Sequence, residues 1–143
     1  MKKIIIVFFV FYTVSFTLLA FAGKQDTSKI ILAKGGKPAA TIVLQKNPDT
    51  HLKIAGEELR NYVKKICGVK LAIKNDGKKV NGTGIYIGRC ALSKKEDFPR
   101  SKYDDRYTIH VRNGNIFLNG GRTVNARQAT LDFIEKNRKL SNL

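Results

Sequence analysis

The chain has 143 residues, and its 27 lysines and arginines against 11 aspartates and glutamates give it a formal charge of +16. It contains two cysteines and no tryptophan. Two cysteines exclude a small scaffold held together by several disulfides. The length is that of one domain, which buries roughly two-thirds of the surface that its unfolded chain exposes.

The first 22 residues have the three parts of a secretory signal peptide. Lys2 and Lys3 precede a mostly apolar stretch over residues 4–19, and a small-x-small cleavage site, Ala20-Phe21-Ala22, follows. This pattern predicts an exported protein, periplasmic or extracellular, that has no stable membrane insertion after cleavage. The alternative is an uncleaved anchor, because the apolar stretch approaches the length of a membrane span. The cleavage site favours removal.

Two β-prone runs follow a polar leader over residues 23–28. Residues 30–33 and 40–44 are apolar and rich in β-branched side chains, and Gly35-Gly36-Lys37-Pro38 separates them. Two such runs around a glycine and proline turn predict a β-hairpin.

The clearest element is a helix that begins near Asp49 or Thr50, either of which can cap its first turn. Apolar residues recur at steps of three and four from Leu52 to Ile66, which places them on one stripe of the helix. Gly68 follows the last turn, where a residue in the left-handed conformation is expected.

Strands and a second hairpin are predicted after this helix. Residues 69–73 alternate as a strand does, and residues 84–88 form a short apolar run bounded by glycines. The run over residues 107–111 and the run over residues 115–118 flank Asn113-Gly114, a dipeptide typical of a tight hairpin turn. The polar stretch between these pairs, residues 89–106, has no periodicity.

A last helix is predicted after Gly120-Gly121, with Thr123 or Asn125 as its cap. Its apolar face comprises Ala126, Ala129, Phe133 and Ile134. The element order β-β-α-β-β-β-β-α predicts an α/β (α+β) fold, a two-layer sandwich in which two helices pack on a mixed β-sheet.

The sequence carries no recognisable catalytic or metal-binding motif. The carboxylate pairs Glu57-Glu58, Glu96-Asp97 and Asp104-Asp105 are adjacent in sequence, whereas glycosidases need two carboxyls that face each other across a sugar. We interpret these pairs as solvated surface. His51 and His110 have no neighbouring cysteine or acidic cluster, so we expect neither a metal site nor a cofactor.

The basic residues are spread over every segment, which indicates a solvated surface that weakly favours acidic partners. No recognition helix or aromatic-basic motif appears, so we expect no nucleic-acid role. Arg89 and Arg122 are the candidate partner contacts, because each follows a glycine-bounded strand end where loops gather. An oxidising compartment allows a disulfide between Cys67 and Cys90; otherwise both are small buried hydrophobic side chains.

Taken in order, several stretches resemble the N-terminal domain of bacterial α-glucuronidases and the related N-terminal domain of β-hexosaminidases. They are residues 55–69, with the sequence AGEELRNYVKKICGV, residues 84–88, with GIYIG, and the paired runs over residues 105–109 and 116–121. The resemblance implies a two-layer α/β unit over residues 29–137. In that family this unit precedes a (β/α)8 barrel that carries the catalytic carboxylates, so no catalytic residue is assigned here.

The chain departs from this family at two places. Cys67 stands where a small hydroxyl residue is usual, and a tail over residues 138–143 ends the sequence where the family continues toward a barrel of about 250 residues. The resemblance therefore implies a truncated product or a stand-alone copy of the domain.

Three functional hypotheses follow. The first is a non-catalytic accessory domain in the degradation of xylan, glucuronide or amino-sugar polysaccharides, with a polysaccharide or a catalytic barrel as its partner. The second is an autonomous binding module for acidic sugars, and the third is a secreted protein-interaction domain.

Overall fold

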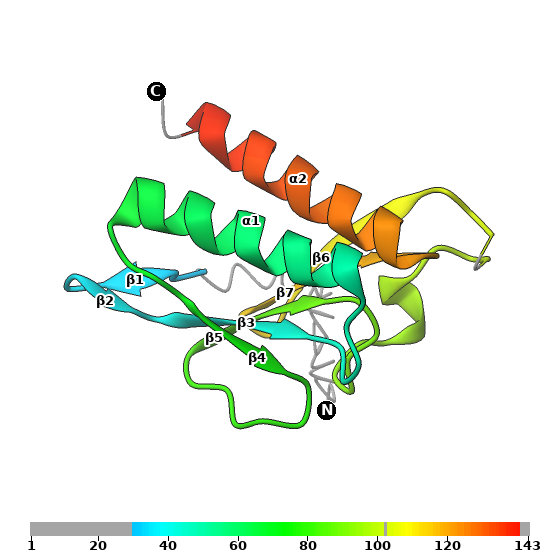
Figure 1. Cartoon of the computed structure of the whole chain (residues 1–143), viewed down its shortest axis with the longest axis horizontal. Helices are drawn as coiled ribbons and strands as arrows, with labels where there is room; N and C mark the ends of the chain where they lie inside the picture. The colour runs from blue at the N-terminus through cyan, green and yellow to red at the C-terminus, as the bar shows by residue number, and fades with distance from the viewer. Residues whose placement is uncertain (1–29, 102, 141–143) are drawn as a thin grey trace, which may run out of the picture.

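The computed structural model describes residues 30–101 and 103–140 (Figure 1). The predicted signal peptide over residues 1–22 and the polar leader lie outside these ranges. Within them, neither helix has the length and apolar character needed to cross a membrane.

The protein consists of a five-stranded mixed sheet with two helices on one of its faces (Figure 1). The strand order is β4-β3-β5-β7-β6, in which only β6 runs antiparallel to its neighbour. The bounds are β3 Ala40–Leu44, β4 Ala72–Asn75, β5 Thr83–Ile87, β6 Tyr107–Arg112, β7 Asn115–Gly120, α1 Thr50–Cys67 and α2 Thr123–Leu140. The predicted two-layer fold, with two helices packed on a mixed sheet, is confirmed.

The sequence analysis predicts the wrong strand pairing for the first hairpin. A two-stranded hairpin does form, but it pairs β1, Ala33–Lys34, with β2, Lys37–Pro38. Strand β3 instead lies inside the main sheet, parallel to both β4 and β5. All five residues of β3 are buried, and a continuous apolar run of this kind is typical of a parallel strand covered on both faces.

The limits of α1 agree with the sequence prediction. The Asp49 carboxylate accepts a hydrogen bond from the Leu52 backbone N–H at 3.1 Å and so caps the first turn. At the other end Gly68 adopts a left-handed conformation, with φ of 71°, and its N–H donates to the Lys64 carbonyl.

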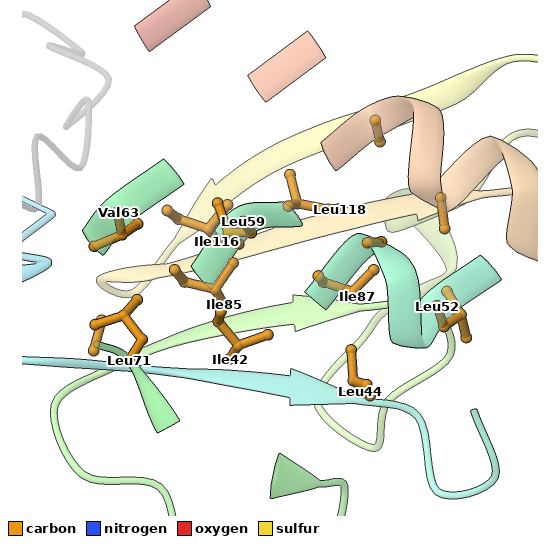
Figure 2. Close-up of a cluster of buried hydrophobic side chains, with 14 of the residues drawn as sticks. Ile42, Leu44, Leu52, Leu59, Val63, Leu71, Ile85, Ile87, Ile116 and Leu118 are labelled. Carbon is orange, nitrogen blue, oxygen red and sulfur yellow. The ribbon is translucent and has the colours of Figure 1, made fainter. Parts of the chain in front are cut away.

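The main core lies between the helices and the sheet (Figure 2). Leu52, Ala55, Leu59 and Val63 are fully buried and form the stripe that the spacing predicts. Ile66, at the end of that stripe, is 43% exposed, so the buried face of α1 stops one turn earlier than expected. Opposite α1 the sheet contributes alternate residues of β3, β5 and β7, namely Ile42, Leu44, Ile85, Ile87, Ile116 and Leu118.

The second predicted hairpin is confirmed. Strands β6 and β7 pair from Tyr107 with Gly120 to Arg112 with Asn115. Asn113 and Gly114 form the turn with φ of 50° and 72°, the left-handed pair that a tight hairpin requires. Helix α2 then begins at Thr123 and extends three residues into the stretch that the sequence assigns to the tail, residues 138–143.

A smaller apolar cluster lies on the sheet face opposite the helices. It contains Val43, Tyr86, Cys90 and Phe117, with Val80 packed against it. The rings of Tyr86 and Phe117 stack with centroids 5.2 Å apart. The irregular segment after β5 contributes Cys90 to this cluster.

Candidate functional site

The carboxyl ends of the parallel strands β3, β5 and β7 meet at one edge of the sheet, the place where open α/β sheets bind ligands. A cavity of about 210 Å³, here called the edge cleft, opens at this edge. Arg89 follows β5 and Arg122 follows β7, and both line the cleft. The structure therefore brings together the two arginines that the sequence predicts as partner contacts.

The backbone around the edge cleft is fixed by local contacts. Gly88 adopts φ of 85° and donates its N–H to the Leu118 carbonyl at 3.1 Å, which joins the ends of β5 and β7. The side-chain carbonyl of Gln45 accepts from the backbone N–H of Arg89 at 3.2 Å. Arg122 is ion-paired with the exposed carboxylate of Asp105. Both arginine side chains stay exposed at the surface.

A larger cavity of about 800 Å³, here called the loop basin, lies in the segment that follows β5. Its lining includes a short 3-10 helix, η1, over Lys95–Asp97. The guanidinium carbon of Arg89 lies 4.5 Å from the centroid of the Phe98 ring. Arg89 also lines the edge cleft, so the two cavities share this residue. The other residues that line the basin are Ser93, Lys94, Lys95, Glu96, Pro99 and Arg100.

A buried ion pair anchors the loop basin to the sheet. Asp97 has no exposed surface, and its carboxylate accepts hydrogen bonds from both terminal guanidinium nitrogens of Arg112, at 2.7 and 2.9 Å. Arg112 also lies over the Phe117 ring, 4.4 Å from its centroid. Burial by itself raises the pKa of Asp97, but the hydrogen bonds from Arg112 and the Lys94 N–H, with the charge of Arg112, outweigh it and lower that pKa.

The interpretation of the acidic pairs as solvated surface is therefore wrong for Asp97, whose buried side chain holds its loop against the sheet. It is also incomplete for Glu58, whose carboxylate accepts from Arg127 at 2.7 Å and links α1 to α2. Asp104, which is only partly exposed, pairs with the exposed Arg106, whose hydrogen bonds lower the pKa of Asp104 to about 2. In the described ranges no group of three metal-ligating side chains gathers.

Cys67 and Cys90 are both free, so the disulfide that the sequence allows between them is not formed. The alternative, that both are small buried hydrophobic side chains, holds only for Cys90. Cys67 is exposed at the end of α1, in the helix layer, whereas Cys90 is buried in the cluster on the opposite face of the sheet. Burial, with a smaller contribution from the charge of Asp76, raises the pKa of the Cys90 thiol to about 12.

This arrangement predicts unequal thiol reactivity, since the thiolate is the nucleophile. Iodoacetamide at pH 8 is expected to add one group to the native protein, on Cys67, and a second only after unfolding. Intact-mass measurements follow both steps, and C67S serves as the control that should stay unmodified while native. Two adducts formed at equal rates, or no adduct before reduction, would contradict the structure.

Comparison with protein-family models finds no match for this sequence, and comparison with curated proteins finds none.

Proposed function

We propose that this chain is an exported, non-catalytic accessory domain of polysaccharide degradation, of the kind found before the catalytic barrel of α-glucuronidases and β-hexosaminidases. The sequence resemblance over residues 29–137 supports the assignment to this class. The two-layer α/β architecture agrees with what that resemblance implies. A polysaccharide or a separate catalytic barrel is the proposed partner.

The observation that carries the non-catalytic part is the state of five carboxylates. A general acid in glycoside hydrolysis needs a raised pKa and a second carboxyl facing it across the substrate. Asp49, Asp97 and Asp104 instead have lowered pKa values. Glu58 and Asp105 are paired with arginines. These groups are therefore already committed to capping or to ion pairs.

The test is a hydrolysis assay on the protein without its first 22 residues. Aryl glucuronides, aryl N-acetylglucosaminides and glucuronoxylan fragments are the substrates that the resemblance suggests. We expect no release of product above that of a heat-denatured sample. Turnover at enzyme-like rates, about 1 s⁻¹ or faster, would show that the non-catalytic assignment is wrong.

A binding module for acidic sugars is the second candidate, and one observation favours it. Arg89 and Arg122 follow strands that are separated in sequence, yet they line one cleft at the carboxyl edge of the sheet. Guanidinium groups recognise carboxylates through paired, directional hydrogen bonds. This candidate is compatible with the first, since an accessory domain can contribute by holding the substrate chain.

A further inference from the structure

We infer that the edge cleft and the loop basin together form one extended site that binds several consecutive units of a uronic-acid polysaccharide. The inference rests on the proposed role in polysaccharide degradation, and it adds the class of ligand and the residues that contact it. Lys94, Lys95 and Arg100 are the contacts that extend the site beyond Arg89 and Arg122.

The first support is the excess of positive charge in the loop basin, which four basic side chains line together with the carboxylate of Glu96. Arg89, Lys94, Lys95 and Arg100 all line this cavity and are exposed. Within the described part of the chain, none of these four side chains forms an ion pair. Several arginines outside the basin, in contrast, are paired with carboxylates. Repulsion among four neighbouring cations is relieved by a ligand that carries several negative charges.

The second support is the size of the two cavities and the residue that they share. The edge cleft, at about 210 Å³, is smaller than an ordinary small-molecule site, whereas the loop basin, at about 800 Å³, lies within the usual range. Because Arg89 lines both, one ligand chain can contact it while its ends lie in the cleft and in the basin. This geometry fits a chain of charged units better than a single sugar acid.

The lining favours a carbohydrate over a nucleic acid. Single-stranded nucleic acids bind on open aromatic faces, but one face of Phe98 is covered by the Arg89 guanidinium. Glu96 adds a carboxylate to the basin. Its oxygens can accept hydrogen bonds from hydroxyl groups, which every sugar unit supplies.

The loop that forms the basin is already held in place before a ligand arrives. Asp97, in η1, is tied to Arg112 on β6, and the Thr108 hydroxyl donates to the Asp97 carbonyl. A preorganised loop loses less conformational entropy on binding, which raises affinity without additional contacts.

The experiment is calorimetric titration of the mature protein with galacturonic acid and its dimer, tetramer and hexamer, with cellohexaose as the neutral control. Affinity is expected to rise by about tenfold or more from monomer to tetramer, as linked sites allow. K94Q/K95Q should lose this gain and keep the weak binding of the monomer. K78Q/K79Q is the matched control, an exposed lysine pair that lines neither cavity, and it should retain the gain.

Three results would overturn the inference: no gain with oligomer length, an equal loss in both lysine variants, or tighter binding of single-stranded DNA of the same charge. Circular dichroism checks that each variant is folded. The hydrolysis assay separates this inference from the proposed function. If the protein neither binds the oligosaccharides nor hydrolyses the substrates, only the extended site is wrong. If it binds longer oligosaccharides more tightly and also hydrolyses the substrates, only the non-catalytic assignment is wrong.

Discussion

Replacing Gly120 by alanine is expected to destabilise the protein by about 3 kcal/mol or more, near the upper end of what overpacking costs. A β-carbon at this position would lie 2.4 Å from the Asn125 β-carbon and 2.8 Å from the Ala126 backbone nitrogen. Backbone atoms cannot move aside as a flexible side chain does, so the end of β7 and the start of α2 must separate. Urea unfolding followed by circular dichroism measures the change.

G114A is the matched control for this prediction. A β-carbon on Gly114 meets no atom within 4 Å, although the backbone there has φ of 72°. The expected cost is about 1 kcal/mol, from the left-handed conformation alone. Equal unfolding midpoints for G114A and G120A would show that β7 and α2 do not pack as closely as described.

Asp97→Asn is expected to cost about 2 to 3 kcal/mol at neutral pH. The substitution keeps the shape of the side chain but leaves the Arg112 charge without its partner in a largely buried setting. Because Arg112 is itself partly exposed, the cost should fall below that of a fully buried broken pair. The control is D105N, whose pair with Arg122 is exposed and should change stability by under about 0.5 kcal/mol.

The effect of D97N should depend on pH in a defined direction. The pKa of Asp97 is lowered in the folded protein, so its ionised form stabilises the fold fully above the unfolded pKa of about 4. That stabilisation disappears as the pH falls through the lower pKa that Asp97 has in the folded protein. The difference in unfolding free energy between wild type and D97N should therefore narrow below about pH 4, and a constant difference from pH 7 to pH 3 would contradict the ion pair.

The sequence was sufficient to predict elements whose signals are local. The Asp49 cap, the stripe from Leu52 to Val63 and the Asn113-Gly114 turn each depend on residues within a few positions of one another. The error in the first hairpin arose because strand pairing is not local. Residues 40–44 read equally well as a hairpin strand or a buried parallel strand, and only the β3–β5 register decides between them.

One part of the candidate site could be predicted from the sequence and the other part could not. Arg89 and Arg122 could be predicted because each follows a strand end, and parallel strands gather such ends at one edge. The loop basin could not be predicted, because residues 89–106 have no periodicity. In addition, the ion pair that holds this segment joins Asp97 to Arg112, which lies 15 residues further along the chain on β6. An aspartate in a polar stretch carries no local sign that it will be buried. The sequence also left open whether Cys67 and Cys90 pair, because an oxidising compartment allows a disulfide but does not indicate which layer of the fold holds each cysteine.

The central claim is that the carboxyl edge of the sheet, rather than the helical face, meets an acidic polysaccharide without cleaving it. The most direct measurement is ¹H–¹⁵N correlation spectroscopy of the protein without its first 22 residues during titration with tetragalacturonate. We expect the amide signals of residues 88–100 and 120–123 to shift in a saturable manner while the oligosaccharide stays intact in the same tube. Shifts confined to α1 and α2, or spectra unchanged at millimolar ligand, would contradict the claim.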